Sequence, residues 1–194
     1  MNPHIRPLYE PIRRTVGVAL TVKAHPGDNL AIHGALGMVR PDDVLVVDWM
    51  GYAEGCGSGA ESLVAPIRSG LAGVVIDGGW RDVDELKEMG FPVFGRHEAA
   101  FSPAKRKPGE INVPVCCGGV IVEAGDVVVA DAEGVAVVPR RHLQDVVRAV
   151  VEAQRRRVEG RSATIATEKS KERSRYYEHL FEAQGGVRAR PAVR

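Results

Sequence analysis

The sequence lacks any apolar run near the length of a membrane span, and its first residues show no basic segment followed by an apolar one. Neither a membrane helix nor a secretory signal is therefore predicted. Cysteine is scarce, with three residues in all. Cys116 and Cys117 are adjacent and Cys56 is alone, which suits neither a CxxC metal site nor a disulfide framework. We expect reduced structural thiols, a cytoplasmic protein and no membrane partner.

A phosphate-binding loop of the form GxxxxGK[ST] is also missing. Residues 55–60 formally satisfy the dinucleotide pattern GxGxxG/A, and Asp77 follows at the end of a later predicted strand. In a true fingerprint, however, the first glycine comes directly after a strand. Six residues from Trp49 to Glu54 intervene here. We therefore interpret these glycines as part of a long loop rather than as a nucleotide site.

The formal net charge of +1 hides a difference between the two ends of the chain. Residues 1–139 hold 12 Lys/Arg against 18 Asp/Glu, whereas residues 140–194 hold 14 against 7. A basic terminal segment is usually a solvated helix face or an arm docked on a neighbouring subunit; a nucleic-acid or acidic protein partner is the alternative. We do not expect a nucleic-acid partner.

The composition, 44% hydrophobic and 26% charged, indicates a globular chain with one core. Apolar patterns predict α/β structure, with a core domain at 1–155 and a C-terminal helical arm at 156–194 that packs on a neighbouring subunit. Besides the strand after Gly73, strands are predicted at 16–22, 44–48, 92–94, 113–122, 127–130 and 135–138. A helical stripe follows at Leu143, Val146, Val147, Val150 and Val151, and a second helix contains Tyr176 and Tyr177.

The most informative stretch is the strand at 74–76 and the turn that follows it. Asp82 with Glu85 three residues later fits a capping box and predicts the start of a helix. Arg81 and Asp82 thus lie where the carboxyl end of a strand meets a helix, which is where open α/β sheets place ligands. Two interpretations stay open. In the first, Asp82 is a helix cap and Arg81 is its ion partner. In the second, both residues act on a ligand.

The glycine-rich segment before this strand also predicts a helix start. Ser58 and Glu61 fit an S-x-x-E capping pattern, which places Gly59 and Ala60 at a helix start with free backbone N–H groups. Such a terminus can bind a small acid. An ordinary capped helix after a flexible loop is the alternative.

Further polar residues gather in two other places. Asn29 and His33 are four apart on a predicted helix and share a face, which is either solvated or the wall of a site. Lys105, Arg106 and Lys107 are consecutive cations in a predicted loop, where such residues are normally solvated.

Three motifs occur in a specific order, namely GDNL at 27–30 with His33, GGWRD at 78–82, and Gly125-Asp126 followed by ADAEGV at 130–135. Together they closely resemble the family that contains the regulator of ribonuclease E activity and the 4-hydroxy-4-methyl-2-oxoglutarate / 4-carboxy-4-hydroxy-2-oxoadipate aldolases. The resemblance covers residues 3–155. It implies a β/β/α swivelling-domain-like fold, a homotrimer or homohexamer (a dimer of trimers), and a site between subunits.

The Asn/His/Lys set resembles the aldolase branch, which implies a divalent-metal-dependent lyase. Such an enzyme cleaves a small 4-hydroxy-2-oxo acid to pyruvate, and oxaloacetate decarboxylation is the implied side activity. By resemblance, Asp82 would hold Mg²⁺ or Mn²⁺ mostly through waters, and Arg81 would bind the keto oxygen. The remaining substrate-binding positions implied by the family are the loop residues Gly59, Ala60, Glu61 and Ser62, with Asn29, His33 and Lys105 around the site.

The sequence also departs from the aldolases. They carry an acid where this chain has Ala60, with Glu61 one place later, and they begin on an earlier helix that contributes another acid. Glu159 is the counterpart of a glutamate that the family supplies from a neighbouring C-terminal helix. The alternative function is a non-catalytic regulator that binds a ribonuclease E-like protein. The family has also been labelled a methyltransferase that acts on a quinone precursor. The sequence does not support this label, because no glycine-rich nucleotide turn follows the first strand.

Overall fold

The computed structural model describes residues 1–159 and 163–184. Contacts divide the chain into two units, Met1–Leu143 and Gln144–Arg194. The first unit is built on a large central sheet and a small two-stranded one, and the described part of the second consists of helices. The domain boundary that we predicted after residue 155 lies inside helix α4 (Leu143–Glu159).

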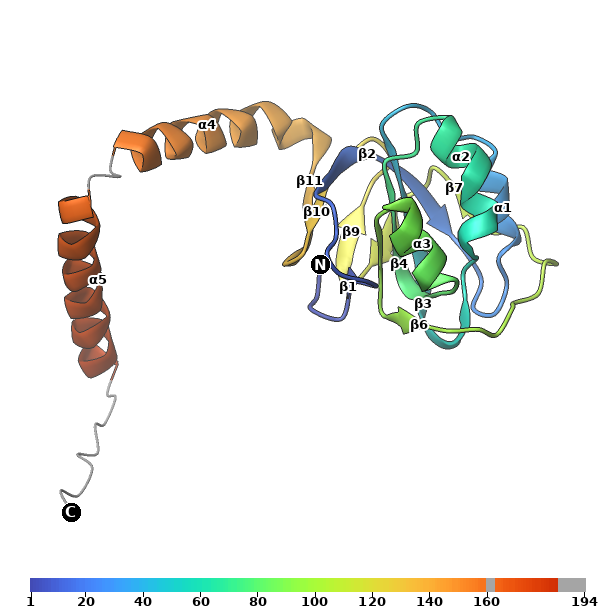
Figure 1. The fold of residues 1–194 in the computed structure, drawn as a ribbon, viewed down its shortest axis with the longest axis horizontal. Coiled ribbons are helices and arrows are strands. Elements are labelled where there is room, and N and C mark those ends of the chain that lie inside the picture. The colour runs from blue at the N-terminus through green and yellow to red at the C-terminus, as the bar shows by residue number, and fades with distance from the viewer. Residues whose placement is uncertain (160–162, 185–194) are drawn as a thin grey trace, which may run out of the picture. The chain divides into compact units, whose positions relative to one another are not determined.

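The central sheet of the first unit combines parallel and antiparallel strands (Figure 1). Its parallel part has the order β5-β4-β3-β2, formed by Val93–Gly95, Gly73–Trp80, Asp43–Cys56 and Thr15–Lys23. Antiparallel strands extend it on both sides, with β10 (Val127–Asp131) and β11 (Gly134–Val138) beyond β2 and β1 (Arg6–Pro7) beyond β5. Short strands β6 (His97–Glu98) and β7 (Glu110–Ile111) pair with β4 and β2.

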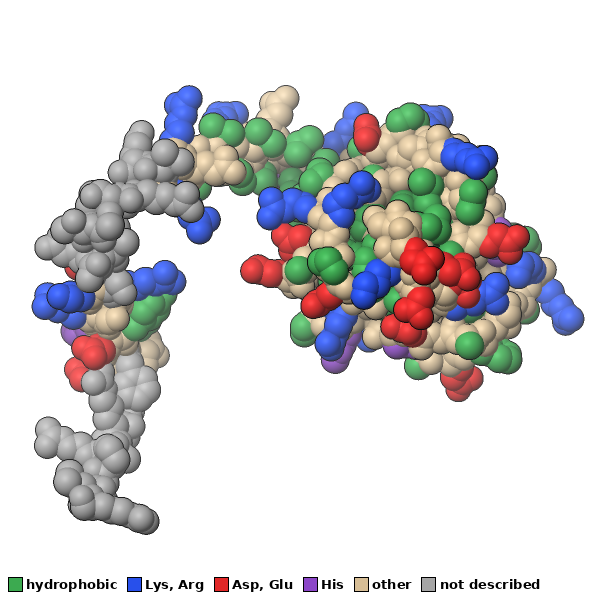
Figure 2. All heavy atoms as spheres, viewed as in Figure 1, with side chains coloured by type: hydrophobic (Ala, Val, Ile, Leu, Met, Phe, Trp, Pro, Cys, Tyr) green, Lys and Arg blue, Asp and Glu red, His purple; other side chains and the backbone are tan. Residues whose placement is uncertain are grey.

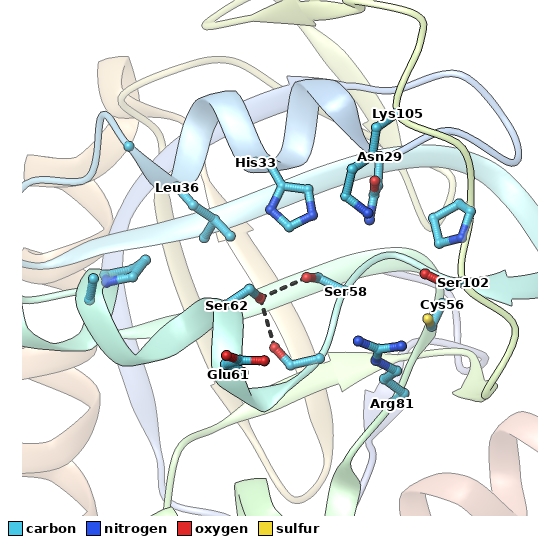
Figure 3. Close-up of a pocket in the computed structure, with 15 residues that line it drawn as sticks. Asn29, His33, Leu36, Cys56, Ser58, Glu61, Ser62, Arg81, Ser102 and Lys105 are labelled. Carbon is cyan, nitrogen blue, oxygen red and sulfur yellow. Dashed lines mark hydrogen bonds between the residues drawn. The ribbon is translucent and has the colours of Figure 1, made fainter.

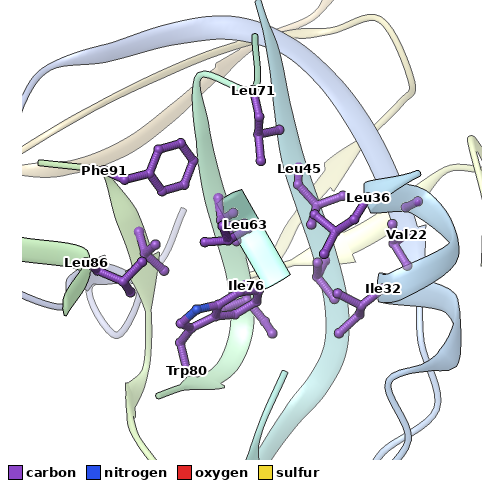
Figure 4. Close-up of a cluster of buried hydrophobic side chains, with 14 of the residues drawn as sticks. Val22, Ile32, Leu36, Leu45, Leu63, Leu71, Ile76, Trp80, Leu86 and Phe91 are labelled. Carbon is purple, nitrogen blue, oxygen red and sulfur yellow. The ribbon is translucent and has the colours of Figure 1, made fainter. Parts of the chain in front are cut away.

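Helices cover one face of this sheet. They are α1 (Leu30–Leu36), the 3-10 helix η1 (Ala60–Leu63), α2 (Val64–Arg68) and α3 (Val83–Met89). Fully buried Ile32, Leu63 and Leu86 from these helices belong to the same apolar cluster as Leu45 and Ile76 of the strands (Figure 4). Burying one such side chain contributes about 1.5–3 kcal/mol, so this layer fixes the helix positions firmly.

A two-stranded hairpin packs on the opposite face of the sheet. It consists of β8 (Val115–Cys117) and β9 (Val120–Val122). Alternate strand residues Val44, Val46 and Val75 form a second buried cluster with Val122 of the hairpin. Hairpin, sheet and helices thus form three layers, which confirms the predicted α/β class and its β/β/α arrangement.

The prediction that residues 49–54 belong to a long loop is wrong, because β3 continues to Cys56. Its pairing with β4 shifts register twice, and Met50 and Gly51 adopt positive φ values of 55° and 69°. Such irregularities bend a strand without ending it. The glycine-rich segment consequently starts at the carboxyl end of a strand, beside the turn that contains Arg81.

The predicted helices of the C-terminal region are present, as α4 and as α5 (Ala163–Ala183). The four valines of the stripe on α4 are solvent-exposed and Leu143 is partly buried, and Figure 2 shows hydrophobic side chains gathered along this helix. Tyr176 and Tyr177 of α5 are also exposed. Among the described residues, no helix is long and apolar enough to cross a membrane. The three cysteines are free thiols, as predicted.

Candidate functional site

A pocket of about 520 Å³ lies between α1, the segment from the end of β3 to α2, and the loop that ends at Lys105 (Figure 3). It brings together residues that are far apart in the sequence. The predicted residues that line it are Asn29, His33, Gly59, Glu61, Ser62, Arg81 and Lys105. Ala60 and Asp82 do not belong to this lining.

The shared face of Asn29 and His33 is a pocket wall rather than a solvated face. Asn29 is 2% exposed, and its amide Nδ2 donates to the carbonyl of Gly57 at 2.7 Å. Its Oδ1 is buried and has no hydrogen-bond partner among the described residues. Burial, and next the charge of Lys105, lower the pKa of His33, so its imidazole is neutral at neutral pH.

A buried carboxylate positions the loop that carries Lys105. Asp28 is 3% exposed and accepts hydrogen bonds from the backbone N–H groups of Leu30, Arg106 and Lys107, at 3.0, 2.7 and 3.1 Å. Burial alone raises a carboxyl pKa, but these three N–H groups outweigh it, so the pKa of Asp28 is lowered. All three cations of this loop are exposed, as expected, and Lys105 also lines the pocket.

The capping box predicted for Asp82 and Glu85 is wrong. Asp82 precedes α3 at the N-cap position, but its side chain makes no capping hydrogen bond. Its backbone is left-handed, with φ 60° and ψ 43°, which directs the side chain away from the helix start. The carboxylate instead accepts a hydrogen bond from the N–H of Ala60 at 3.1 Å and lies 3.5 Å from Nε of Arg81. Strained backbone of this kind concentrates at functional sites.

The second capping pattern is wrong as well. The residue before η1 is Gly59, in an extended conformation and without a side-chain cap, so Ser58 lies one position too early. The hydroxyl of Ser58 donates to Oγ of Ser62 at 2.6 Å, and Ser62 donates to the carbonyl of Gly59 at 2.7 Å (Figure 3). A Cβ at Gly59 would collide with the carboxylate of Asp82 and with Nε of Arg81. This close approach requires glycine.

Arg81 extends its guanidinium into the pocket near Cys56 and Ser102 (Figure 3). Its side chain is 42% exposed, yet its Nε is buried and makes no hydrogen bond among the described residues. The neighbouring carboxylate of Asp82 partly balances its charge. The pocket therefore contains a partly exposed guanidinium that a ligand can reach.

Sequence reasoning missed several lining residues, including Leu36, Cys56 and Ser102. Leu36 could have been found, because it follows Asn29 and His33 on the same face of α1. Cys56 is 1% exposed and its Sγ lies 3.2 Å from the carbonyl oxygen of Phe101. Burial raises its pKa, so this thiol is a protonated wall residue rather than a nucleophile.

Asp82 faces a second hollow of about 440 Å³, which is also lined by Arg81 and Glu98. Groups of three or more metal-ligating side chains do not occur in the described part of the chain. One or two carboxylates are nevertheless a donor set that suits Mg²⁺, because this ion usually keeps several of its waters. Asp82 with Glu98 therefore fits a water-rich divalent site and does not fit a dedicated protein cage.

The β/β/α fold thus places an Arg-Asp pair directly after strand β4, and Arg81 of this pair shares a pocket with Lys105. The sequence was compared with models of known protein families, and one family matches. The model of the RraA-like family (Aldolase/RraA) matches residues 1–137. The chain therefore belongs to the RraA-like family, and the resemblance seen in its three motifs is confirmed.

Individual relatives carry two kinds of names. The chain is 39% identical over 144 residues to a Halalkalibacterium halodurans protein named "Putative 4-hydroxy-4-methyl-2-oxoglutarate aldolase", with 74% of this chain and 68% of that protein covered. Among solved structures, the Streptomyces coelicolor RNase ES inhibitor-family protein RraAS2 matches with TM-score 0.71 and 32% identity, covering 81% of each chain. The RNA-processing inhibitor RraA of Thermus thermophilis matches with TM-score 0.65 and 26% identity, covering 72% of this chain and 84% of that one.

Proposed function

We propose that this protein is a divalent-metal-dependent lyase that cleaves a 4-hydroxy-2-oxo acid to pyruvate, with oxaloacetate decarboxylation as a side activity. One observation carries the proposal. Arg81 extends its guanidinium into the pocket, and the Asp82 carboxylate, 3.5 Å from its Nε, does not cap its own helix. The carboxylate instead accepts the N–H of Ala60 and pairs with Arg81 at the edge of the pocket. The aldolase names of several relatives agree with the proposal.

The reaction requires a group that stabilises an enolate. When the C3–C4 bond of the substrate breaks, its electron pair passes into the pyruvate fragment and charge develops on the keto oxygen. The Arg81 guanidinium is a fixed fork of donors suited to this oxygen. Its position in the pocket supports this role.

The carboxylate of the 2-oxo acid needs donors of its own. Gly59, Glu61 and Ser62 line one wall of the pocket, and backbone N–H groups of this segment would donate to the carboxylate. Lys105 adds an ammonium group on a loop that Asp28 holds in place. Together these groups would orient the acid with its keto oxygen toward Arg81.

The C4 hydroxyl must lose a proton as the bond breaks. Asn29 offers a buried Oδ1 without a partner, which would accept a hydrogen bond from this hydroxyl. His33 lies one turn along α1 and is neutral at neutral pH, so its imidazole nitrogen would accept the proton.

The metal is part of the proposal. Asp82 would hold Mg²⁺ or Mn²⁺ mostly through waters, with Glu98 as a second carboxylate in the same hollow. When bound, the ion would supply Lewis-acid polarisation of the 2-oxo acid. The aldolases have an acid at the position of Ala60. In this chain, Glu98 would supply the supporting carboxylate instead.

We also propose a homo-oligomer, either a trimer or a dimer of trimers. The exposed stripe of α4 is an apolar face that a second copy would cover, and Val147 on this stripe is 53% exposed. The side chain of Glu159, the predicted contribution to a neighbouring site, lies outside the described part of the chain. Light scattering at micromolar concentration tests the assembly, and a monomer would contradict it.

The second candidate is a regulator that binds a ribonuclease E-like protein, which the names of the two structural relatives favour. The two candidates differ in a simple assay. Pyruvate release is measured from oxaloacetate and from 4-carboxy-4-hydroxy-2-oxoadipate, with Mg²⁺, with Mn²⁺ and after chelation. A lyase releases pyruvate only with metal. A protein that releases none under any condition supports the regulator.

A further inference from the structure

The pocket extends further along α1 than a pyruvyl group requires. Asn29 precedes the helix, His33 lies one turn on, and Leu36 and Gly37 mark its far end. At 1.5 Å per residue, the path from Asn29 to Gly37 is about 12 Å long. Figure 3 shows Arg81 and Lys105 toward one end of the pocket and Leu36 toward the other, with His33 between them.

The far end of the pocket is apolar. Leu36 is 7% exposed and belongs to the main core, and Pro66 of α2 is buried. Ala65 completes this part of the lining. The cations that line the pocket in the described chain are Arg81 and Lys105, at the opposite end, with the neutral His33 between.

The charges at this end disfavour a second carboxylate. The acidic residue of the lining, Glu61, lies on the same segment as Ala65, and Figure 3 places it on the side away from Lys105. A carboxylate that reached past His33 would lose water without gaining a cation, and it would approach a like charge. An alkyl group in the same place would lose only its contact with water.

We propose that the substrate is a 4-hydroxy-2-oxo monocarboxylic acid whose C4 carries an apolar chain, seated between Leu36 and Pro66. This inference rests on the proposed function and names its substrate class. The C3–C4 bond breaks, its electron pair forms the enolate at C3, and the C4 hydroxyl loses its proton. Protonation of C3 then gives pyruvate, and C4 leaves as an aldehyde, without oxidation or reduction.

A matched pair of substrates tests the inference. In 4-hydroxy-2-oxooctanedioate the terminal methyl group of 4-hydroxy-2-oxooctanoate is replaced by a carboxylate, and the chain length is unchanged. We expect kcat/KM for pyruvate release to be at least about tenfold higher with the monoacid, because the diacid must leave a charge unpaired at the apolar end. Equal or better turnover of the diacid overturns the inference and leaves the proposed lyase function standing.

A positive charge placed at the apolar end should shift the preference toward the diacid. Ala65 is exposed on α2, so Ala65→Lys is expected to fold and to bring an ammonium group to this end. We expect the ratio of diacid to monoacid kcat/KM to rise at least about tenfold. Val64→Lys is the matched control, since Val64 is 41% exposed and does not belong to the lining, and its ratio should equal that of the parent.

The two proposals fail in different ways. An unchanged ratio in Ala65→Lys, with a melting temperature equal to that of the parent, contradicts the placement of the chain. If neither acid nor oxaloacetate yields pyruvate in the presence of Mg²⁺ or Mn²⁺, the lyase function falls and the inference falls with it.

Discussion

Asp82 accepts a hydrogen bond from the backbone N–H of Ala60 at 3.1 Å and leaves the start of its own helix uncapped. The contact joins the glycine-rich segment to the Arg81 turn across the edge of the sheet. It places a carboxylate and a guanidinium between two hollows, one with Lys105 and one with Glu98. The pocket thus depends on this turn for its shape as well as for its charge.

Asp82→Asn separates charge from structure. Asn tolerates the left-handed backbone, and its Oδ1 can still accept the N–H of Ala60, so the free energy of unfolding without metal should change by less than about 1 kcal/mol. Turnover should fall at least about 10²-fold, because the negative charge that would hold the metal is gone. Chemical denaturation and a pyruvate assay measure the two effects. Full activity in this variant would show that the carboxylate charge is dispensable.

Gly59→Ala should damage the site through its shape. The added Cβ would meet the Asp82 carboxylate and Nε of Arg81, so the turn must shift. We expect a stability loss of about 1–3 kcal/mol and a fall in kcat/KM of about 10²-fold. Gly90→Ala is the control. Its φ of 62° costs about 1 kcal/mol, but a Cβ there meets nothing within 4 Å, so turnover should not change. Equal activity in both variants would contradict the tight approach at Gly59.

Asp28 should make stability depend on pH in the acid range. Its pKa is lowered in the folded state, so its contribution is present above the ordinary value of 3.8 and is lost as the pH falls through the folded value. The difference in unfolding free energy between the parent and Asp28→Asn should therefore be largest at neutral pH and shrink below pH 3.8. Urea denaturation at several pH values measures it. A difference that grows on acidification has the wrong sign for this account.

His33 should titrate below the ordinary histidine value of 6.5, first because it is buried and second because of Lys105. Removing that positive charge in Lys105→Met should raise the pKa of His33, and an NMR titration of its imidazole without substrate would show the shift. The acid limb of the kcat/KM profile should move to higher pH in the same variant. A pKa unchanged between parent and variant would place Lys105 too far from His33 to affect it.

The fold could be predicted from the sequence because its strands are short apolar runs between clear turn signals. Asn29, His33 and Arg81 could be placed on the same grounds, from helical spacing and from the end of a strand. The two capping patterns failed because φ at Asp82 and the extended Gly59 are set by tertiary contacts. Asp28 holds residues far along the chain, at Arg106 and Lys107, and such a bond leaves no local pattern in the sequence.

The central claim is that Arg81 stabilises an enolate formed in the presence of a divalent metal. Oxaloacetate decarboxylation, followed by pyruvate release with Mg²⁺ or Mn²⁺ and after exhaustive chelation, is compared between the parent and Arg81→Lys. We predict metal-dependent turnover in the parent and a loss of about 10²-fold in the variant, because Lys keeps the charge but loses the planar fork of donors. Turnover that survives chelation, or that is equal in parent and variant, would contradict the account.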